Sequence, residues 1–435
     1  MAAGKDEPSA QPPGTDLLDP VAVDDQHRYF AALRERDPVI WSPEQQGWVL
    51  TRYADVAAAL GDPRLSSDRA RPLLDVLHGE RLVRTARVLD VMQHWMVVND
   101  PPMHTRLRRL AARALRPQRV QAMRARVARL VDELLDEFVA GGHRDLIEHF
   151  AFPLPATVIA ELIGAPPEDR ARFRHWSHEL ALVAFGAGGD ARDARHDRAS
   201  HGLEEMLAYF DELIERARGT HGEHMIADLL AGDGSEDRLS DEELRAMCAL
   251  MLFAGHETTT SLIAAAVMLL LRNPDQLASL RGDPELIGGA VEEALRCEGP
   301  ARALVRWVTE DLEIGGKRIA AGERVFAVLP AANRDPERFP DADRFDIRRH
   351  PNVHLAFGKG IHACIGALLA RIEARIAVAA IVERLPGLAL ADQQLQWAAS
   401  IGSHGLERLE VEHRAARAGP RREAPVPRPT TNRLF

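Results

Sequence analysis

The chain has 435 residues, of which 46% are hydrophobic and 28% are charged, a composition typical of a folded globular protein rather than a disordered or fibrous one. The 65 acidic residues outnumber the 55 basic ones, and a net charge of −10 disfavours nucleic-acid binding, which needs concentrated positive charge. Only three cysteines occur and the N-terminus carries no apolar signal segment, so we expect a reducing compartment, the cytoplasm.

Pro-rich ends flank a domain with helical periodicity. Residues 1–16 and 414–435 are expected to be a disordered leader and tail around one domain, 17–413. The pattern predicts a hairpin from 38–41 and 47–51, and helices at 117–140, 153–164, 167–186, 199–218, 240–272, 274–281, 284–297 and 364–385. Short β-like pieces are expected at 303–309, 312–314, 324–329 and 406–412. Since strands do not alternate regularly with helices, these elements indicate a mainly α fold with a small β region.

The segment 244–271 is apolar enough to suggest a membrane span. Its two apolar runs are each too short to cross a bilayer, and Glu257 between them would be costly at bilayer depth. We therefore expect no membrane span, and instead a central buried helix.

A polar cluster lies in the middle of that helix. The letters HETTT begin like the zinc-protease motif HExxH, but Thr260 replaces the second histidine, which excludes that metal site. The small residues Ala254 and Gly255 leave room for a ligand beside the proton donors Glu257 and Thr258. A close contact between two helices explains the small residues equally well.

The Gly-rich stretch HLAFGKGIHACIG (354–366) precedes the last predicted helix. Its letters GKGIHA fit the dinucleotide pattern GxGxxA, but no βαβ unit surrounds them and Cys364 would stay unexplained. A thiolate at a helix N-terminus, with glycines leaving space for a large planar group, explains Cys364 and suits haem iron. The alternative is an inert buried cysteine, which is the interpretation we give to Cys248 and Cys297.

Two further patterns are ambiguous by themselves. Glu293 and Arg296 share a helix face and could be only a solvated ion pair. A Pro-Pro pair opens a helix on which His104 and Arg108 align at i, i+4, so they could hold a carboxylate or form a solvated basic face.

Taken together, these patterns resemble those of the cytochrome P450 family. Residues 357–366 fit its haem-ligand signature FGxGxHxCxG at every fixed position, Glu293 and Arg296 fit ExxR, and 254–258 fit AGx(D/E)T. The resemblance covers about residues 19–412. It implies a single-domain cytochrome P450 fold and the activity of a haem-thiolate monooxygenase.

The resemblance also implies roles for individual residues. It implies haem b (iron protoporphyrin IX) as cofactor, with Cys364 as its metal ligand and Phe357 shielding the sulfur. The other cofactor-binding residues would pair with the two haem propionates: His104, Arg108, Arg306 and His362. The catalytic acid and alcohol, delivering protons to dioxygen, would be Glu257 and Thr258. A structural triad supporting the ligand loop would be Glu293, Arg296 and Arg338. The substrate pocket would be lined by Leu250, Phe253, Ala254, Leu304, Val305 and Ile401.

The same resemblance implies partners. Soluble bacterial members of the family receive electrons from NAD(P)H through a ferredoxin reductase and a ferredoxin. We expect a local basic dock for the acidic ferredoxin on the thiolate side, formed by Arg109, Arg113, Lys359 and Arg371. The expected assembly is a monomer, and the expected substrates are O2 and a hydrophobic small molecule such as a terpenoid, steroid, fatty acid or macrolide.

Two other functions compete with this prediction. Peroxide-driven fatty-acid hydroxylation, as the family performs it, uses an arginine near the iron, where this chain has Glu257. A haem-containing binding or sensing protein would have no use for the proton donors Glu257 and Thr258. Arg302 could meet an acidic substrate or play a surface role.

Overall fold

The computed structural model describes residues 14–76, 78–184, 192–218, 224–231 and 237–413, so most of the expected leader and all of the expected tail lie outside the described residues. Thr15 and Asp16, which the sequence assigned to the leader, are packed against the first hairpin. Thr15 donates a hydrogen bond to Glu44 over 2.8 Å, and Gln45 donates to Asp16 over 2.7 Å. The folded domain therefore includes residues ahead of 17.

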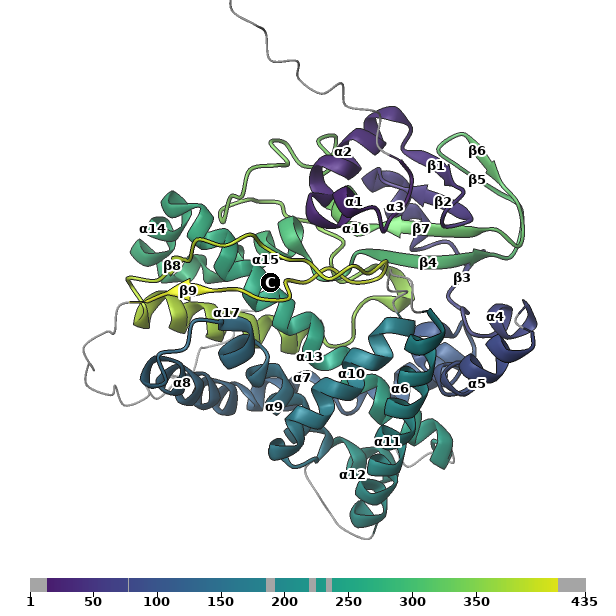
Figure 1. Cartoon of the computed structure of the whole chain (residues 1–435), viewed down its shortest axis with the longest axis horizontal. Coiled ribbons are helices and arrows are strands. Elements are labelled where there is room, and N and C mark those ends of the chain that lie inside the picture. Colours follow the sequence, from purple (N-terminus) through teal and green to yellow (C-terminus); the bar gives the residue numbers. More distant parts are fainter. Residues whose placement is uncertain (1–13, 77, 185–191, 219–223, 232–236, 414–435) are drawn as a thin grey trace, which may run out of the picture.

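Helices make up most of the described chain, and Figure 1 shows them gathered around α13. Their bounds are α1 Pro20–Asp24, α2 Gln26–Arg36, α3 Tyr53–Ala59, α4 Arg71–Val76, α5 Glu80–Met92, α6 Met103–Ala112, α7 Pro117–Ala122, α8 Arg124–Ala140, α9 Pro153–Ile163, α10 Arg170–Ala184, α11 Arg192–Ala217, α12 Met225–Ala231, α13 Asp241–Arg272, α14 Pro274–Gly282, α15 Ile287–Glu298, α16 Leu329–Asn333 and α17 Ala367–Arg384.

The strands of the described residues form three small sheets, and in Figure 1 β1 to β7 lie on one side of the helices while β8 and β9 lie apart from them. The strands are β1 Val39–Ser42, β2 Gly47–Leu50, β3 Leu65–Ser66, β4 Ala303–Val308, β5 Leu312–Ile314, β6 Lys317–Ile319, β7 Arg324–Val328, β8 Ala389–Leu390 and β9 Val411–Glu412. Five of them form a sheet in the order β1-β2-β7-β4-β3, in which only the β2–β7 pair is parallel. This sheet brings an N-terminal hairpin beside strands from the last third of the chain.

The mainly α architecture with a small β region is confirmed. The predicted elements differ from the observed ones in some boundaries, and several short elements were not predicted. The helix expected at 117–140 is divided at Met123 into α7 and α8. The helix expected from Cys364 begins only at Ala367, because residue 363 is extended and Cys364 stays in the preceding loop. The sequence did not predict α2, α3, α5 or β6, because their short apolar patterns are interrupted by charged residues.

The long helix α13 forms the core of the protein. A capping box starts it, in which Ser240 and Glu243 exchange hydrogen bonds of 2.9 and 3.1 Å. Among the described residues, α13 is the one helix long and apolar enough to cross a bilayer, and 67% of its most apolar window is buried inside the protein. Because α9, α11, α15 and α17 pack around it, its apolar composition is explained by burial.

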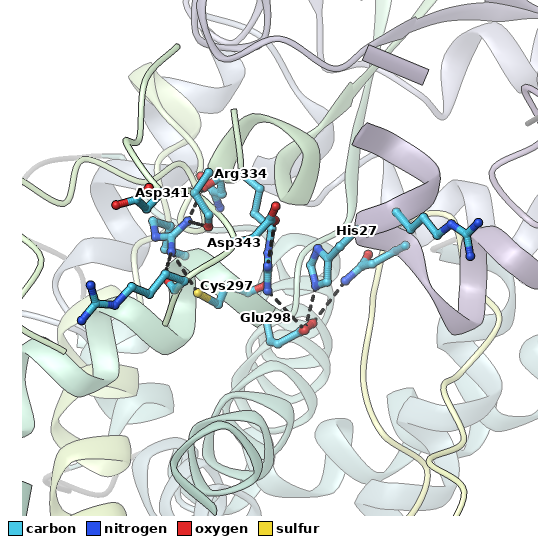
Figure 2. A network of polar contacts seen from close by, with 12 residues as sticks. His27, Cys297, Glu298, Arg334, Asp341 and Asp343 are labelled. Atoms are coloured by element: carbon cyan, nitrogen blue, oxygen red, sulfur yellow. Dashed lines mark hydrogen bonds and ion pairs between the residues drawn. The ribbon is translucent and has the colours of Figure 1, made fainter. Parts of the chain in front are cut away.

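A buried polar network fixes the C-terminal end of α15 (Figure 2). Glu298 lies 2.7 Å from the Nε2 atom of His27 on α2, and 3.8 Å from Arg334 on its other side. Burial would raise the pKa of Glu298, but His27, His404 and Arg334 offset it and lower that pKa to about 2. The network ties α2 to the segment that precedes the Gly-rich loop.

Arg302 belongs to the same structural framework. Its Nη1 atom donates to the carbonyls of Leu17 (2.6 Å) and Ser400 (2.8 Å), and its guanidinium lies over the ring of Phe30. The side chain is only 1% exposed, so neither role considered from the sequence, a contact with an acidic substrate or a surface position, agrees with the structure. Arg302 instead joins the N-terminal segment to the C-terminal segment.

Candidate functional site

The loop before α17 presents one thiol. Cys364 is exposed, whereas Cys248 and Cys297 are buried, and burial raises the pKa of both buried thiols. The backbone of Cys364 donates to the carbonyl of Phe357 over 2.8 Å, which closes the loop. Gly358 and Gly360 hold this loop with positive φ angles of 69° and 71°, which only glycine adopts without strain.

The surroundings of the Cys364 sulfur act on its pKa in two directions. Although the residue is accessible, desolvation by the protein around the sulfur raises the pKa of this thiol overall, while the backbone N–H groups of Gly366 and Ala367 and the cations Arg108 and Arg371 lower it. A metal ion bound to the sulfur would override this rise, because coordination deprotonates a thiol outright.

Helix α6 brings basic side chains to the same loop. Arg108 donates to the carbonyl of Ala363, the residue before Cys364, over 2.7 Å. The rings of His104 and His362 lie 4.3 Å apart. Both ring nitrogens of His104 and the Nε2 atom of His362 are buried without a hydrogen-bond partner. Such donors are costly to leave unpaired, so the site is built for a ligand with acceptor oxygens.

Arg306 on β4 adds a buried cation. Its side chain is 6% exposed. Within the described part of the chain, its Nη1 atom donates a hydrogen bond to the backbone carbonyl of Val305 over 2.9 Å. Burial first, and then the nearby cation Arg69, lower its pKa to about 10. The nearest acid, Asp100, already accepts hydrogen bonds from Ser66 and from the backbone N–H of Ser67.

The two propionates of a haem would fit these observations. Arg306 is a buried cation whose pKa is lowered by burial and by the nearby Arg69, and His104 and His362 carry unpaired nitrogens. Burial, together with Arg306 and His104, lowers the pKa of His362 to about 3, so this ring is neutral and can donate one hydrogen bond. Two carboxylates are the complement that this cluster lacks.

The polar cluster of α13 divides between two faces. Gly255 lies against α9, where an added Cβ would come within 2.7 Å of Ile159, and His256 is buried beside Phe152. Ala254 is exposed, and Glu257 and Thr258 are partly accessible on the other face. Both interpretations of the small residues therefore apply, a helix contact for Gly255 and an open face for Ala254.

Glu257 and Thr258 have properties that suit proton transfer. Burial raises the pKa of Glu257 to about 8, so its carboxyl group can carry a proton at neutral pH. The hydroxyl of Thr258 donates to the carbonyl of Ala254 over 3.1 Å, which holds the hydroxyl against the open face of the helix.

The Glu293–Arg296 pair is fully buried rather than solvated. The guanidinium of Arg296 donates twice to the carboxylate of Glu293, each time over 2.8 Å, and both side chains are 0% exposed. The third member of this cluster is Arg349, whose Nε lies 3.0 Å from Glu293. Arg338 was expected in that position, but its side chain is exposed and its guanidinium lies over the ring of Tyr53 at 5.2 Å.

The six residues expected to line a substrate pocket come from different packing clusters. Leu250 and Phe253 are 3% exposed in the α13 core, and Phe253 stacks on Trp95. Ala254 is accessible. Leu304 on β4 packs against one sheet cluster, and the remaining two, Val305 and Ile401, pack against the other.

Three residues near this site were not found from the sequence. Arg69 lies beside Arg306 after strand β3, Arg349 completes the contacts of Glu293, and Glu292 binds two arginines of α17. No motif marks Arg69 or Arg349, since each meets its neighbour only through tertiary folding. For Glu292, its position directly before the ExxR glutamate was a signal that could have been used.

Comparisons with known proteins give the class to which this fold belongs. A family model described as Cytochrome P450 matches residues 187–386. The chain is 43% identical to Cytochrome P450 107B1 of Saccharopolyspora erythraea, over 91% of this chain and 97% of that protein. It is also 43% identical to Cytochrome P450 monooxygenase PikC of Streptomyces venezuelae, over 95% and 98%.

A solved structure agrees with these relatives. The crystal structure of P450BioI in complex with hexadec-9Z-enoic acid ligated acyl carrier protein has a TM-score of 0.84 at 35% identity, and covers 90% of this chain and 99% of that one. The chain belongs to the cytochrome P450 family and is a P450 monooxygenase with a haem cofactor.

Proposed function

We propose that the chain binds haem b through the Cys364 thiolate and inserts one oxygen atom of O2 into a hydrophobic small molecule. The observation that carries this proposal is the buried cluster of Arg306, His104 and His362, whose cation and ring nitrogens lack partners beside an accessible thiol. When bound, the haem supplies the redox chemistry of dioxygen activation.

The chain's own residues would perform the remaining steps. Arg108 and Arg306 would neutralise the two propionates and orient the ring, with His104 and His362 donating hydrogen bonds to them. Glu257 would hold a proton at its carboxyl group near neutral pH, and Thr258 would relay it from its hydroxyl. The apolar residues Leu250, Phe253, Ala254, Leu304, Val305 and Ile401 would exclude water from the substrate.

The purified protein provides the test of the cofactor. Reduction with dithionite under carbon monoxide should produce the long-wavelength absorption band of a thiolate-bound haem. Cys364→Ser should abolish that band, while Cys297→Ser should retain it, because Cys297 is buried beside Arg296. A carbonyl complex of the wild-type protein without this band would overturn the proposal.

The electron donors are proposed to be NAD(P)H, a ferredoxin reductase and a ferredoxin, acting in the cytoplasm. Two cations of the expected dock have internal partners, since Arg109 pairs with Asp237 and Arg371 with Glu292. Lys359 donates to the backbone carbonyl of Ala57 over 3.2 Å, a partner that does not neutralise its charge, so the dock would depend on Arg113 and Lys359.

Charge reversal separates this dock from a general charge effect. Arg113→Glu with Lys359→Glu should weaken the apparent affinity for ferredoxin at low salt and approach wild type at high salt, because surface attraction is screened. Arg318→Glu, in the β5–β6 hairpin, is the control and should leave the affinity unchanged. An unchanged affinity in the double variant would remove the dock from the proposal.

For the substrate we propose a macrolide-sized or steroid-sized apolar molecule. Relatives at 36–39% identity are named vitamin D(3) 25-hydroxylase, 6-deoxyerythronolide B hydroxylase and mycinamicin IV hydroxylase/epoxidase. A panel of macrolactones, steroids, terpenoids and free or carrier-bound fatty acids can be screened by the shift of the haem Soret band. A shift with fatty acids alone, together with peroxide-driven turnover, would favour the competing hydroxylase.

A further inference from the structure

Glu292 is the centre of a charged cluster behind the ligand loop that no step of the proposed reaction uses. Its carboxylate accepts two hydrogen bonds from Arg371, each of 2.8 Å, and one from Arg375 of 3.1 Å. The two arginines are four residues apart on α17, so they approach Glu292 from one helix face. Glu292 itself projects from α15, next to the Glu293 that holds Arg296.

A fourth side chain joins this cluster from the ligand loop. The Nε2 atom of His354 lies 3.2 Å from Glu292, while its Nδ1 atom accepts the backbone N–H of Ala356. A neutral imidazole with an accepting Nδ1 carries its proton on Nε2, so His354 donates to the carboxylate. Burial would raise the pKa of Glu292, but His354 and Arg371 outweigh it and hold the pKa well below its usual range.

The geometry connects this cluster to the thiol. The guanidinium carbon of Arg371 lies over the Phe357 ring, 4.4 Å from its centre, which is a cation–π contact. The carbonyl of Phe357 accepts the backbone N–H of Cys364 over 2.8 Å. The bidentate hydrogen bonds to Glu292 hold the guanidinium in place over the aromatic ring that closes the loop.

We propose that Glu292 is a positioning residue for the thiolate. It holds the cation of Arg371 over Phe357 and partly compensates its charge beside the Cys364 sulfur, and so it sets the reduction potential of the haem iron. The inference rests on the proposed ligation of the iron by Cys364. Reduction adds one negative charge to the haem–thiolate unit, so a nearby uncompensated cation favours the reduced state. Glu292 compensates Arg371 and Arg375 and thereby limits this effect.

Opposite charge changes should give opposite shifts. Glu292→Gln removes the compensating charge, so the midpoint potential of the holoenzyme should become more positive. At a fixed solution potential, the fraction of ferrous protein should rise several-fold. Arg371→Gln removes the cation and should shift the potential to more negative values. Arg371→Lys keeps the positive charge but loses the bidentate hydrogen bonds to Glu292. Its midpoint potential should therefore shift less than that of Arg371→Gln.

A remote pair of the same geometry provides the control. Arg126 donates to both carboxylate oxygens of Glu161, with its Nε over 3.0 and 3.1 Å and its Nη2 over 2.7 Å, between α8 and α9. Glu161→Gln should lower the stability without moving the potential. A purely structural role of Glu292 predicts the same behaviour for Glu292→Gln, so an unmoved potential in both would overturn the inference.

The remaining outcomes are also decisive. If Glu292→Gln binds no haem, the Arg371→Gln potential decides alone, with a negative shift supporting the inference and no shift overturning it. If both variants shift in the same direction, the charge argument is wrong. If the wild-type protein itself lacks the long-wavelength carbonyl band, the proposed ligation fails first; a normal wild-type band with unmoved potentials contradicts only the role of Glu292.

Discussion

The imidazole rings of His104, on α6, and His362, two residues before Cys364, lie with their centroids 4.3 Å apart. Neither residue has a carboxylate partner, and the buried Arg306 lowers the pKa of His362 further. One buried cation and two imidazole rings from separate segments are thus held close together. An anionic ligand would supply the acceptors and the negative charge that this cluster lacks, so the affinity for haem tests its role.

Arg306→Gln should act in opposite directions on the apoprotein and the holoprotein. Haem binding should weaken by about 2–5 kcal/mol, because one propionate loses a buried charged partner. The apoprotein should unfold at the same or a higher temperature, since the variant removes a buried cation without a partner. Hemin titration and thermal unfolding of both forms measure the two effects. Destabilisation of both forms alike would contradict a ligand-directed role of Arg306.

The two candidate third members of the buried cluster can be distinguished by stability. Arg349→Gln should cost about 2–4 kcal/mol, because Arg349 binds Glu293 at 3.0 Å and also donates to the carbonyls of Pro340, Asp341 and Arg344. Arg338→Gln should cost only about 0.5–1 kcal/mol, the value of an exposed cation–π contact. Urea unfolding measures both, and the reverse order would restore Arg338 to the triad.

Glu373 on α17 predicts a pH-dependent stability. The side chain is 1% exposed, one carboxyl oxygen has no partner, and burial raises its pKa to about 8 from 4.5. Between these values the folded protein keeps a proton that the unfolded chain has lost, so this contribution to stability is greatest below about pH 4.5 and falls as the pH rises to 8.

Glu373→Gln should therefore stabilise the protein at pH 9, on the order of 3 kcal/mol, and have little effect near pH 4.5. Glu383→Gln, exposed on the same helix, is the matched control and should show no such dependence. Denaturant unfolding of the three proteins at both pH values is the measurement. Parallel pH curves for wild type and Glu373→Gln would show that Glu373 is ionised in the folded state.

Thr258→Ala should retain haem and substrate binding but divert electrons to peroxide, because the hydroxyl that would relay protons is lost. Thr260→Ala is the matched control. Its hydroxyl makes the same kind of bond, to the carbonyl of His256 over 2.9 Å, but from the buried face of α13. Product formed per NADPH consumed should fall in Thr258→Ala and stay near the wild-type value in Thr260→Ala. Equal coupling in Thr258→Ala and wild type would exclude the relay.

Local sequence was sufficient wherever a pattern was long or tied to a motif. The long helix α13 followed from an apolar run with Glu257 inside it, and the positive φ angles of Gly358 and Gly360 agree with the glycine-rich loop expected before Cys364, since backbone conformation and periodicity are local properties. Short elements such as α3 and β6 were missed, because a few residues carry too weak a pattern without the surfaces they pack against.

The amino-acid sequence alone determined the family and the mainly α architecture and predicted Cys364 as the ligand cysteine, because these depend on fixed spacings along the backbone. Only the tertiary structure decided which charged groups meet. It exchanged Arg338 for Arg349 beside Glu293, buried Arg302 among carbonyls, and directed Arg371 to Glu292. Charged groups interact strongly only when they lie a few ångströms apart. Residues that are far apart in the sequence come that close only after folding.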